Sequence, residues 1–265
     1  MDNSFIFECE DCFKKLELLK DNSIRLVLTD IPYGIGFENT YSSEQKWDDN
    51  FTDDEYIEFI KKLLTELKRI ITEDGNIWLF CGIKKLNDIF KVAKDVGLYI
   101  NLKDWKSLHR QKGRGSKNKP KSQREEIIHL TKSKKFLFKD NSDLFSYKEN
   151  TTNVMNCYTG ETERPIFNID NKVFCFKMPY YLSTTEKQIH SCQKSILLLY
   201  SLIMNYSNES DIVLDPFSGS CSCGIATKLA NRNFIGYEFD KDTYSKAETW
   251  LKLFNYQSYR SSFLK

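Results

Sequence analysis

Along the first half of the chain, apolar runs alternate with segments in which apolar residues recur at helical spacing. Continuous apolar runs at residues 5–7, 24–29 and 76–82 have the length and composition of buried strands. Residues 98–105 and 126–131 give two weaker runs of the same kind. We therefore predict five strands before residue 132.

Helical periodicity fills the gaps between these strands. Thr52 and Glu55 form a capping-box pattern, and apolar residues at helical spacing follow until Gly75, where we expect the helix to stop. A second amphipathic helix is predicted over residues 84–96 and ends at Gly97. The alternation of strand and helix favours an α/β fold with a mostly parallel sheet.

The same rhythm returns near the end of the chain. A leucine-rich helix is predicted over residues 188–206, a strand over 211–214 and a helix over 221–230. A strand over 233–238 and a helix over 241–254 complete the pattern. Together with the first half, these elements predict one large α/β domain.

Residues 132–186 break the rhythm, with short aromatic pieces between polar turns. We interpret them as a small insert with short strands. The predicted organisation is a first half over residues 1–131, the insert over 132–186 and a second half over 187–265.

Composition bears on where the protein is expected to reside and on whether it binds a metal. The 265 residues are 40% apolar and carry a formal net charge of +2. No apolar stretch approaches the ~20 residues of a membrane span, and the N-terminus lacks a secretion signal, so a cytoplasmic protein with reduced thiols is expected. Cys9 and Cys12 have the spacing of a metal or redox pair, but no second pair exists and the three histidines are not at ligand spacing. We expect no metal.

Two strand ends carry candidate chemistry. The first is Thr29-Asp30-Ile31-Pro32-Tyr33, which is either a plain strand exit or a pocket with a carboxylate, a rigid backbone and an aromatic plane. In the second, Asp215 ends a strand, a small-residue turn follows, and Glu238 ends the next strand about 20 residues after Gly219. This arrangement is either an ordinary βαβ unit or a nucleoside site, and it lacks the G-x-G-x-x-G pattern of a dinucleotide site.

Five motifs in a fixed order resemble one enzyme family. DPFSGS with GYEFD is similar to the S-adenosylmethionine motif of the amino-methyltransferases, and TDIPYG to their catalytic motif. EDCF, REEIIHLTK and KQIHSCQKSILLL resemble three further segments. The catalytic motif precedes the cofactor motif, which is the circularly permuted order of the β class of DNA amino-methyltransferases. The resemblance implies a Rossmann-like methyltransferase fold, in which the insert recognises the target sequence.

The resemblance also implies roles at the first strand end. Asp30 and the carbonyl of Ile31, held by Pro32, would accept the two N–H groups of a base amine, and Tyr33 would stack on the flipped base. Adenine N6 is favoured over cytosine N4 because the motif begins with Asp rather than Ser. Ile31 replaces the usual first proline; its carbonyl can still serve, so we expect activity to survive.

Cofactor contacts follow from the same resemblance, for S-adenosylmethionine without a metal. The implied residues are Asp11, Lys194, Asp215, Phe217, Gly219, Ser220 and Glu238. Cys221 stands where the family has glycine, and a positive φ there would cost ~1–2 kcal/mol. The HSCQKS segment at the start of the second half also lacks both usual prolines, which leaves a weak or inactive member open.

Positive charge is concentrated in one segment. Residues 103–124 hold nine lysines and arginines and one acid, a local charge of +8 in a chain of +2. We predict a flexible loop that contacts DNA phosphates, against the alternative of a solvated loop. The predicted contacts are Lys106, Arg110, Lys112, Arg114, Lys117, Lys119, Lys121 and Arg124.

Three functions stay open at this point. The first is a DNA methyltransferase in a restriction-modification or regulatory setting, acting on adenine N6 or on cytosine N4. The second is methylation of an RNA base or a protein glutamine, against which the permuted order argues. The third is a non-catalytic nucleic-acid-binding module. The resemblance further implies a homodimer and a cognate restriction endonuclease.

Overall fold

A single mixed sheet organises the protein. The computed structural model describes residues 4–34, 51–114, 122–139, 154–156 and 193–263. Within these residues nine strands form the sheet, in the order β1-β9-β8-β2-β3-β6-β5-β7 with β4 also paired to β6. The strands are β1 (Phe5–Cys9), β2 (Ile24–Asp30), β3 (Ile71–Cys81), β4 (Tyr99–Ile100), β5 (Lys106–Arg114), β6 (Ser122–Thr131), β7 (Val154–Asn156), β8 (Ile212–Asp215) and β9 (Asn233–Glu238).

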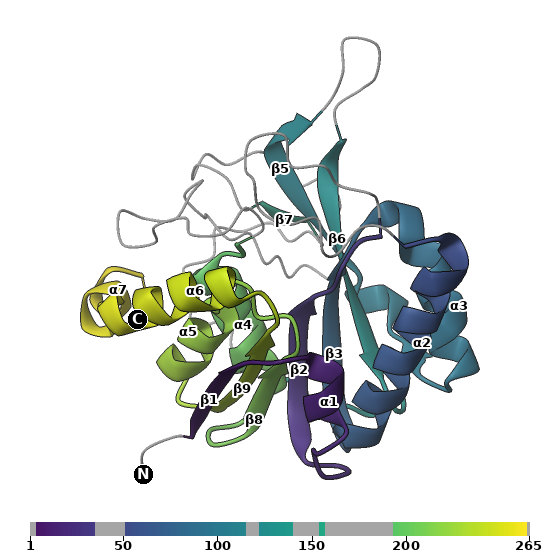
Figure 1. The fold of residues 1–265 in the computed structure, drawn as a ribbon, viewed down its shortest axis with the longest axis horizontal. Coiled ribbons are helices and arrows are strands. Elements are labelled where there is room, and N and C mark those ends of the chain that lie inside the picture. Colours follow the sequence, from purple (N-terminus) through teal and green to yellow (C-terminus); the bar gives the residue numbers. More distant parts are fainter. Residues whose placement is uncertain (1–3, 35–50, 115–121, 140–153, 157–192, 264–265) are drawn as a thin grey trace.

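Helices cover both faces of this sheet (Figure 1). The helices α1 (Cys12–Leu16), α2 (Asp53–Ile70) and α3 (Leu86–Asp95) contribute to one apolar cluster. The helices α4 (Ile196–Tyr206), α5 (Ser222–Leu229), α6 (Lys241–Leu253) and α7 (Tyr256–Phe263) contribute to the other. Two short 3-10 helices, η1 (Ile83–Lys85) and η2 (Leu102–Asp104), lie between these elements along the chain.

The strands divide their side chains between the two clusters. In β3, Ile77 and Leu79 pack with α2 and α3, whereas Trp78 and Phe80 pack with α4 and α5. Successive side chains of a strand point to opposite faces, so a strand that is buried on both faces is apolar throughout. This is why the apolar runs at residues 24–29 and 76–82 predicted β2 and the second half of β3.

The direction in which the chain moves across the sheet reverses between β2 and β8. The strands β1, β9, β8, β2 and β3 run parallel to one another, so their carboxyl ends lie along one edge. From β2 the chain crosses to β3 on one side, and from β8 it crosses to β9 on the other. A crevice at such a switch point is the usual ligand site of an open α/β sheet.

The helix predicted to stop at Gly75 ends earlier. The capping box is present, with Glu55 N–H donating to Thr52 Oγ1 and Thr52 N–H to a Glu55 carboxylate oxygen. However, α2 ends at Ile70, and Gly75 lies inside β3. The predicted stop was wrong because pairing of Ile71 with Ile24 of β2 pulls the backbone into an extended conformation before the glycine.

Two further predictions in this half were wrong. The strand expected over residues 98–105 is only β4, followed by η2. Of the basic segment, expected as a flexible loop, residues 106–114 and 122–124 lie instead in the antiparallel strands β5 and β6, with His109 opposite Arg124, while residues 115–121 lie outside the described residues. The reason is long-range pairing, since β6 offers its second edge to both β4 and β5. Figure 1 shows β5 and the adjoining part of β6 extending beyond the rest of the sheet.

The predicted insert lies largely outside the described residues. Its first part, residues 132–139, packs on the main sheet, where the Phe136 ring contacts His129 and Leu137 N–H donates to Asp74 O. The strand β7 pairs in parallel with β5. Residues 188–192 of the predicted helix also lie outside the description. Among the helices of the described part, none is long and apolar enough to cross a membrane.

Candidate active site

The tips of β2 and β8 are joined by a buried hydrogen bond. Thr29 Oγ1 donates to Asp215 Oδ1 at 2.6 Å, and both residues are at least 95% buried. The two residues are 186 positions apart in the chain. The two strand ends that the sequence marked out therefore meet at one place, at the point where the sheet changes direction.

Asp30 is the acid at the centre of this place. Its Oδ2 is 2.5 Å from Lys194 Nζ, and its Oδ1 accepts the Tyr33 hydroxyl at 2.8 Å. The segment before α4 supplies Lys194, so the cation arrives from the second half of the chain. The Lys194 ammonium also lies 5.2 Å from the centre of the Phe80 ring.

Glu125 completes the cluster, and the sequence assigned it no role. It is 5% exposed on β6, its Oε1 is 2.6 Å from the Tyr33 hydroxyl, and the same oxygen is 3.6 Å from Lys194 Nζ. The available signal was the REEIIHLTK segment, which resembled the family but carried no assigned chemistry. We call Asp30, Tyr33, Glu125 and Lys194 the acid cluster.

Burial perturbs the acid cluster electrostatically. Burial raises the pKa of Asp30; Lys194 opposes this shift and Glu125 reinforces it, leaving the pKa above its ordinary value. The pKa of Tyr33 is raised well above 10 by burial and by the two neighbouring carboxylates. The tyrosine hydroxyl therefore keeps its proton at every physiological pH.

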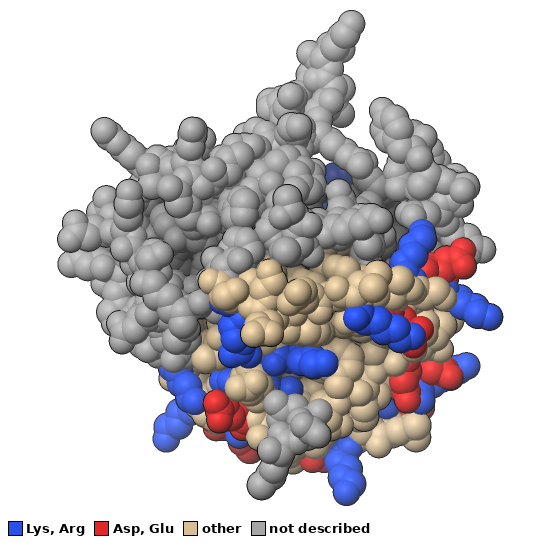
Figure 2. Space-filling model, turned by 90° about the vertical axis from the view of Figure 1, so that its left-hand side faces the viewer, with Lys and Arg blue, Asp and Glu red and all other residues tan. Residues whose placement is uncertain are grey.

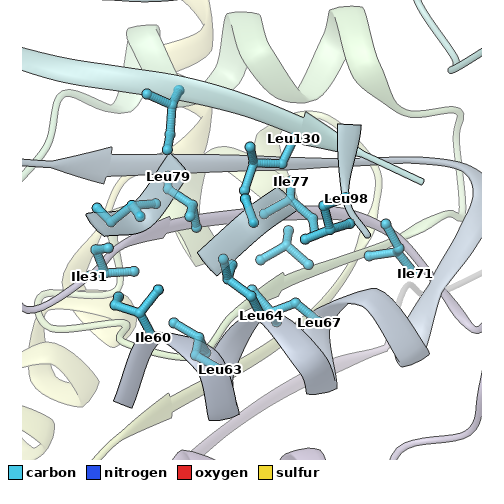
Figure 3. Packing of buried hydrophobic residues seen from close by; sticks show 14 of the residues in the cluster. Ile31, Ile60, Leu63, Leu64, Leu67, Ile71, Ile77, Leu79, Leu98 and Leu130 are labelled. Carbon is cyan, nitrogen blue, oxygen red and sulfur yellow. The ribbon is translucent and has the colours of Figure 1, made fainter. Parts of the chain in front are cut away.

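The backbone after Asp30 is held by α2. Tyr56 donates its hydroxyl to Pro32 O at 3.1 Å, and Gly34 has φ +59° with its Cα against the Tyr56 ring. A Cβ at Gly34 would lie 2.5 Å from that ring, so glycine is required on both counts. Ile31 stands where the resembled family has proline. Its side chain points into the apolar cluster with Ile60 and Leu79 and packs there (Figure 3).

The turn after β8 is built around Glu238. Gly219 N–H donates to Glu238 Oε2 and Asp240 N–H donates to Glu238 Oε1, each at 2.8 Å. Gly219 has φ +49°, a conformation that glycine adopts without steric cost. Burial raises the pKa of Asp215 to about 7, against the lowering effect of the Thr29 hydroxyl.

Cys221 adopts the conformation for which the family's glycine is suited. Its φ of 59° and ψ of 28° are left-handed, and its side chain is fully buried. The left-handed region costs a non-glycine residue ~1–2 kcal/mol. Burial raises the pKa of the thiol well above 9, so it packs as a neutral, small apolar group.

The other predicted cofactor residues lie along the same edge of the sheet. Asp11 follows β1 and caps α1, accepting from Phe13 N–H at 2.9 Å. Phe217 is half-buried in the turn, with its N–H donating to Asp215, and the Ser220 hydroxyl is 2.8 Å from that of Ser222. Lys194 is placed on Asp30, and its contact with a cofactor stays a prediction.

Comparison with known proteins identifies the family. The family model described as DNA methylase matches residues 24–249, which includes both strand tips and the acid cluster. The chain belongs to the DNA methylase family. The type II methyltransferase M.HpaI of Haemophilus parainfluenzae is 31% identical to this methylase over 88% of the chain and 70% of that protein. M.HinfI of Haemophilus influenzae is 29% identical, over 91% and 67% respectively.

The fold of the methylase also matches solved structures. The crystal structure of the M1.HpyAVI–SAM complex has a TM-score of 0.60 at 20% identity and covers 93% of this chain and 98% of that one. This likeness confirms the Rossmann-like fold expected from the sequence.

The polar groups around the turn after β8 fit a nucleoside cofactor without phosphates. The groups that face the turn are carboxylates, Asp215 and Glu238, together with the backbone at Gly219. Carboxylates accept from hydroxyl and ammonium groups and repel phosphate. Each carboxylate oxygen of Glu238 already accepts one backbone N–H and has a lone pair left for a ligand.

The predicted DNA contacts of the methylase divide into three groups. Lys106 at the start of β5 lies half-buried, with its ammonium 5.2 Å from the centre of the Trp78 ring. Lys117, Lys119 and Lys121 lie outside the described residues. The remaining ones, Arg110, Lys112, Arg114 and Arg124, are on β5 and β6. On the face seen in Figure 2, the described acidic and basic side chains are intermixed.

Proposed function

We propose that this DNA methylase transfers the methyl group of S-adenosylmethionine to the N6 amine of adenine in DNA. The observation that carries the proposal is the position of Asp30, at the tip of β2 beside the Asp215 turn. An aspartate at the first place of the motif is the feature that favours adenine over cytosine.

The residues at the β2 tip would raise the reactivity of the amine. The lone pair of an exocyclic amine is delocalised into the ring, so the free amine is a poor nucleophile. Asp30 and the carbonyl of Ile31 would each accept one N–H, which turns the lone pair out of the ring plane. Tyr33 would stack on the flipped base, a contact of ~1–3 kcal/mol by analogy with single-strand binding. S-adenosylmethionine, when bound, supplies a methyl group already activated by the positive sulfur.

The residues of the second half would hold the cofactor. Glu238 would accept from the ribose hydroxyls, and Asp215 from the methionine ammonium. Phe217, Gly219 and Ser220 would line the turn, while Asp11 would meet the adenine ring. Lys194 keeps its proposed place near the methionine end, where it also pairs with Asp30.

DNA contact is proposed for the β5–β6 hairpin. The eight predicted lysines and arginines would bind phosphates, so affinity should fall as salt rises. Sequence choice is assigned to the insert over residues 132–186. The type II names of the relatives support a restriction-modification setting; a cognate endonuclease and a dimer stay predictions.

The test is substitution of Asp30 with nucleoside analysis of the product. Purified protein is incubated with unmodified DNA and S-adenosylmethionine, and the DNA is digested and analysed for N6-methyladenine and N4-methylcytosine. Asp30→Ala should lose methyl transfer at least ~10²-fold while calorimetry shows unchanged cofactor binding. Asp54→Ala, on the exposed first turn of α2, is the matched control. Methylated cytosine would overturn the adenine assignment, and near-normal turnover of Asp30→Ala would overturn the role of Asp30.

A further inference from the structure

One hydroxyl in the acid cluster stands between two carboxyl groups. The Tyr33 oxygen is 2.8 Å from Asp30 Oδ1 and 2.6 Å from Glu125 Oε1, both within the hydrogen-bonding range for oxygen pairs. A phenol carries a single proton and can donate it to only one of these oxygens. The other short contact needs a second proton, because otherwise lone pairs of two oxygens would face each other. The geometry therefore contains one proton more than an ionised Asp30 and an ionised Glu125 would hold.

The charges around the two carboxyl groups favour the retention of that extra proton. Lys194 Nζ lies 2.5 Å from Asp30 and 3.6 Å from Glu125, so one ammonium is shared by two carboxylates that are mostly buried. Two buried acids this close titrate as a pair, and one of them holds its proton to a higher pH.

Among the described residues, the other titratable groups near the pair are acids as well. Burial raises the pKa of the Cys81 thiol of β3, and the nearby carboxylates of Glu126, Asp30 and Glu125 raise it further. Burial raises the pKa of Asp215 of β8, and the Asp30 carboxylate contributes a further rise. None of these groups adds positive charge, so a ligand that brings a cation to this place would change the proton balance.

We propose that Glu125 stores a proton for the methyl transfer. In the unliganded protein the pair shares the proton through the Tyr33 hydroxyl. The pair gives it up when the positively charged methyl donor binds, and Glu125 takes up the proton that the target amine later loses. This inference rests on the proposed function and adds a positioning and proton-holding residue to it.

The step balances in atoms and charge. The amine nitrogen forms a bond to the methyl carbon, and the bond from that carbon to sulfur breaks with its electrons staying on sulfur. One proton of the nitrogen passes to Asp30 Oδ1. Asp30 passes a proton to the Tyr33 oxygen, and the Tyr33 hydroxyl gives its own proton to Glu125 Oε1. The positive charge that leaves the sulfur thus ends as a proton in the acid cluster, and the net charge of the site does not change.

Calorimetry tests the proton balance without catalysis. S-adenosylmethionine and S-adenosylhomocysteine differ by the methyl group and the positive charge on sulfur. Binding of each is measured at pH 7.5 in buffers of different ionisation enthalpy, which gives the number of protons released. We expect S-adenosylmethionine to release about one proton more than S-adenosylhomocysteine, by the charge linkage of paired acids.

Glu125→Gln should abolish this difference while both ligands still bind, because glutamine can accept from Tyr33 but cannot store a proton. Tyr33→Phe should also abolish it, and this second variant decides the matter if the first does not fold. Equal proton release for both ligands in the wild-type protein, or a retained difference in the variants, would overturn the inference. Failure of the wild-type protein to bind either ligand would instead count against the proposed function.

Single-turnover methylation supplies the second readout. Glu125→Gln should slow the transfer ~10²-fold, in the range of lost general-base assistance, with the KM values for DNA and cofactor unchanged. The wild-type rate should rise with pH because of the stored proton, and the rate of Glu125→Gln should not show this rise. The matched control is Glu126→Gln, the next buried glutamate of β6, whose carboxylate accepts from Trp105 Nε1 at 2.7 Å. Equal effects of the two substitutions would reject a special role for Glu125.

Discussion

Replacing Thr29 with valine would test whether the two strand tips are held together as the structure has them. Valine keeps the shape of threonine and removes the hydroxyl that donates to Asp215. Thr29 is 2% exposed and Asp215 is 5% exposed, so water cannot readily replace the lost bond. The change therefore removes one partner of a buried carboxyl group and leaves the other in place.

The magnitude depends on the charge of Asp215. A hydrogen bond to a charged group contributes ~1.5–3 kcal/mol to folding, and one between neutral groups ~0.5–1.5 kcal/mol. The pKa of Asp215 is about 7, so the group is mostly neutral at pH 5.5 and mostly charged at pH 8.5. Thr29→Val should thus lower the free energy of unfolding by ~1 kcal/mol more at pH 8.5 than at pH 5.5.

The sign follows from linkage. Burial holds the folded-state pKa of Asp215 above its unfolded value, so its contribution is greatest at low pH and is lost as pH rises through about 7. Removing the Thr29 hydroxyl raises this pKa further, by about one unit for each 1.4 kcal/mol. The variant must therefore lose more stability than the wild-type protein over the same rise in pH.

Urea unfolding at the two pH values, followed by tryptophan fluorescence, measures this difference. Thr29→Ser keeps a hydroxyl and should restore much of the loss, while Thr65→Val on exposed α2 surface controls for the chemical change itself. In an Asp215→Asn background the cost of Thr29→Val should no longer depend on pH. A cost that is the same at both pH values, or no cost at all, would refute the assigned bond.

Two further predictions concern the frame around the site. Gly34→Ala should destabilise the protein by more than ~2 kcal/mol in urea unfolding, because the left-handed φ costs ~1–2 kcal/mol and the new Cβ meets the Tyr56 ring. Gly97→Ala, which shares the positive φ but meets only the Lys68 side chain, should cost less, and equal losses would contradict the steric argument. Thr52→Ala should cost ~1 kcal/mol by removing the N-cap of α2, and recovery of stability in Thr52→Ser is the check.

Local pattern was sufficient wherever a segment's structure depends on its own residues. The strands β2 and β9 and the start of the helix α2 were predicted within a residue or two, because buried strands are apolar throughout and the capping box acts within one turn. Pattern failed where pairing between distant strands decided the outcome. Examples are the end of α2 and the hairpin β5–β6, and neither has a local signal strong enough to compete with a partner strand.

The candidate site divides in the same way. The sequence by itself marked Asp30, Asp215 and Glu238, because each acid stands at the end of an apolar strand. It also implied their chemistry by resemblance. It could not place Thr29 on Asp215, or bring Glu125 and Lys194 to Asp30. These contacts join residues 69 to 186 positions apart, and only the order of the strands brings them together.

The conformation of Cys221 was likewise left open by the sequence, which could state only what a positive φ would cost. The turn between β8 and α5 decided it, where Cys221 N–H donates to Ser218 O at 2.7 Å directly before the helix begins. Residue types and local spacing thus determined which groups could do chemistry. The order of strands in the sheet decided which of them meet, because a hydrogen bond forms over about 3 Å whatever the distance along the chain.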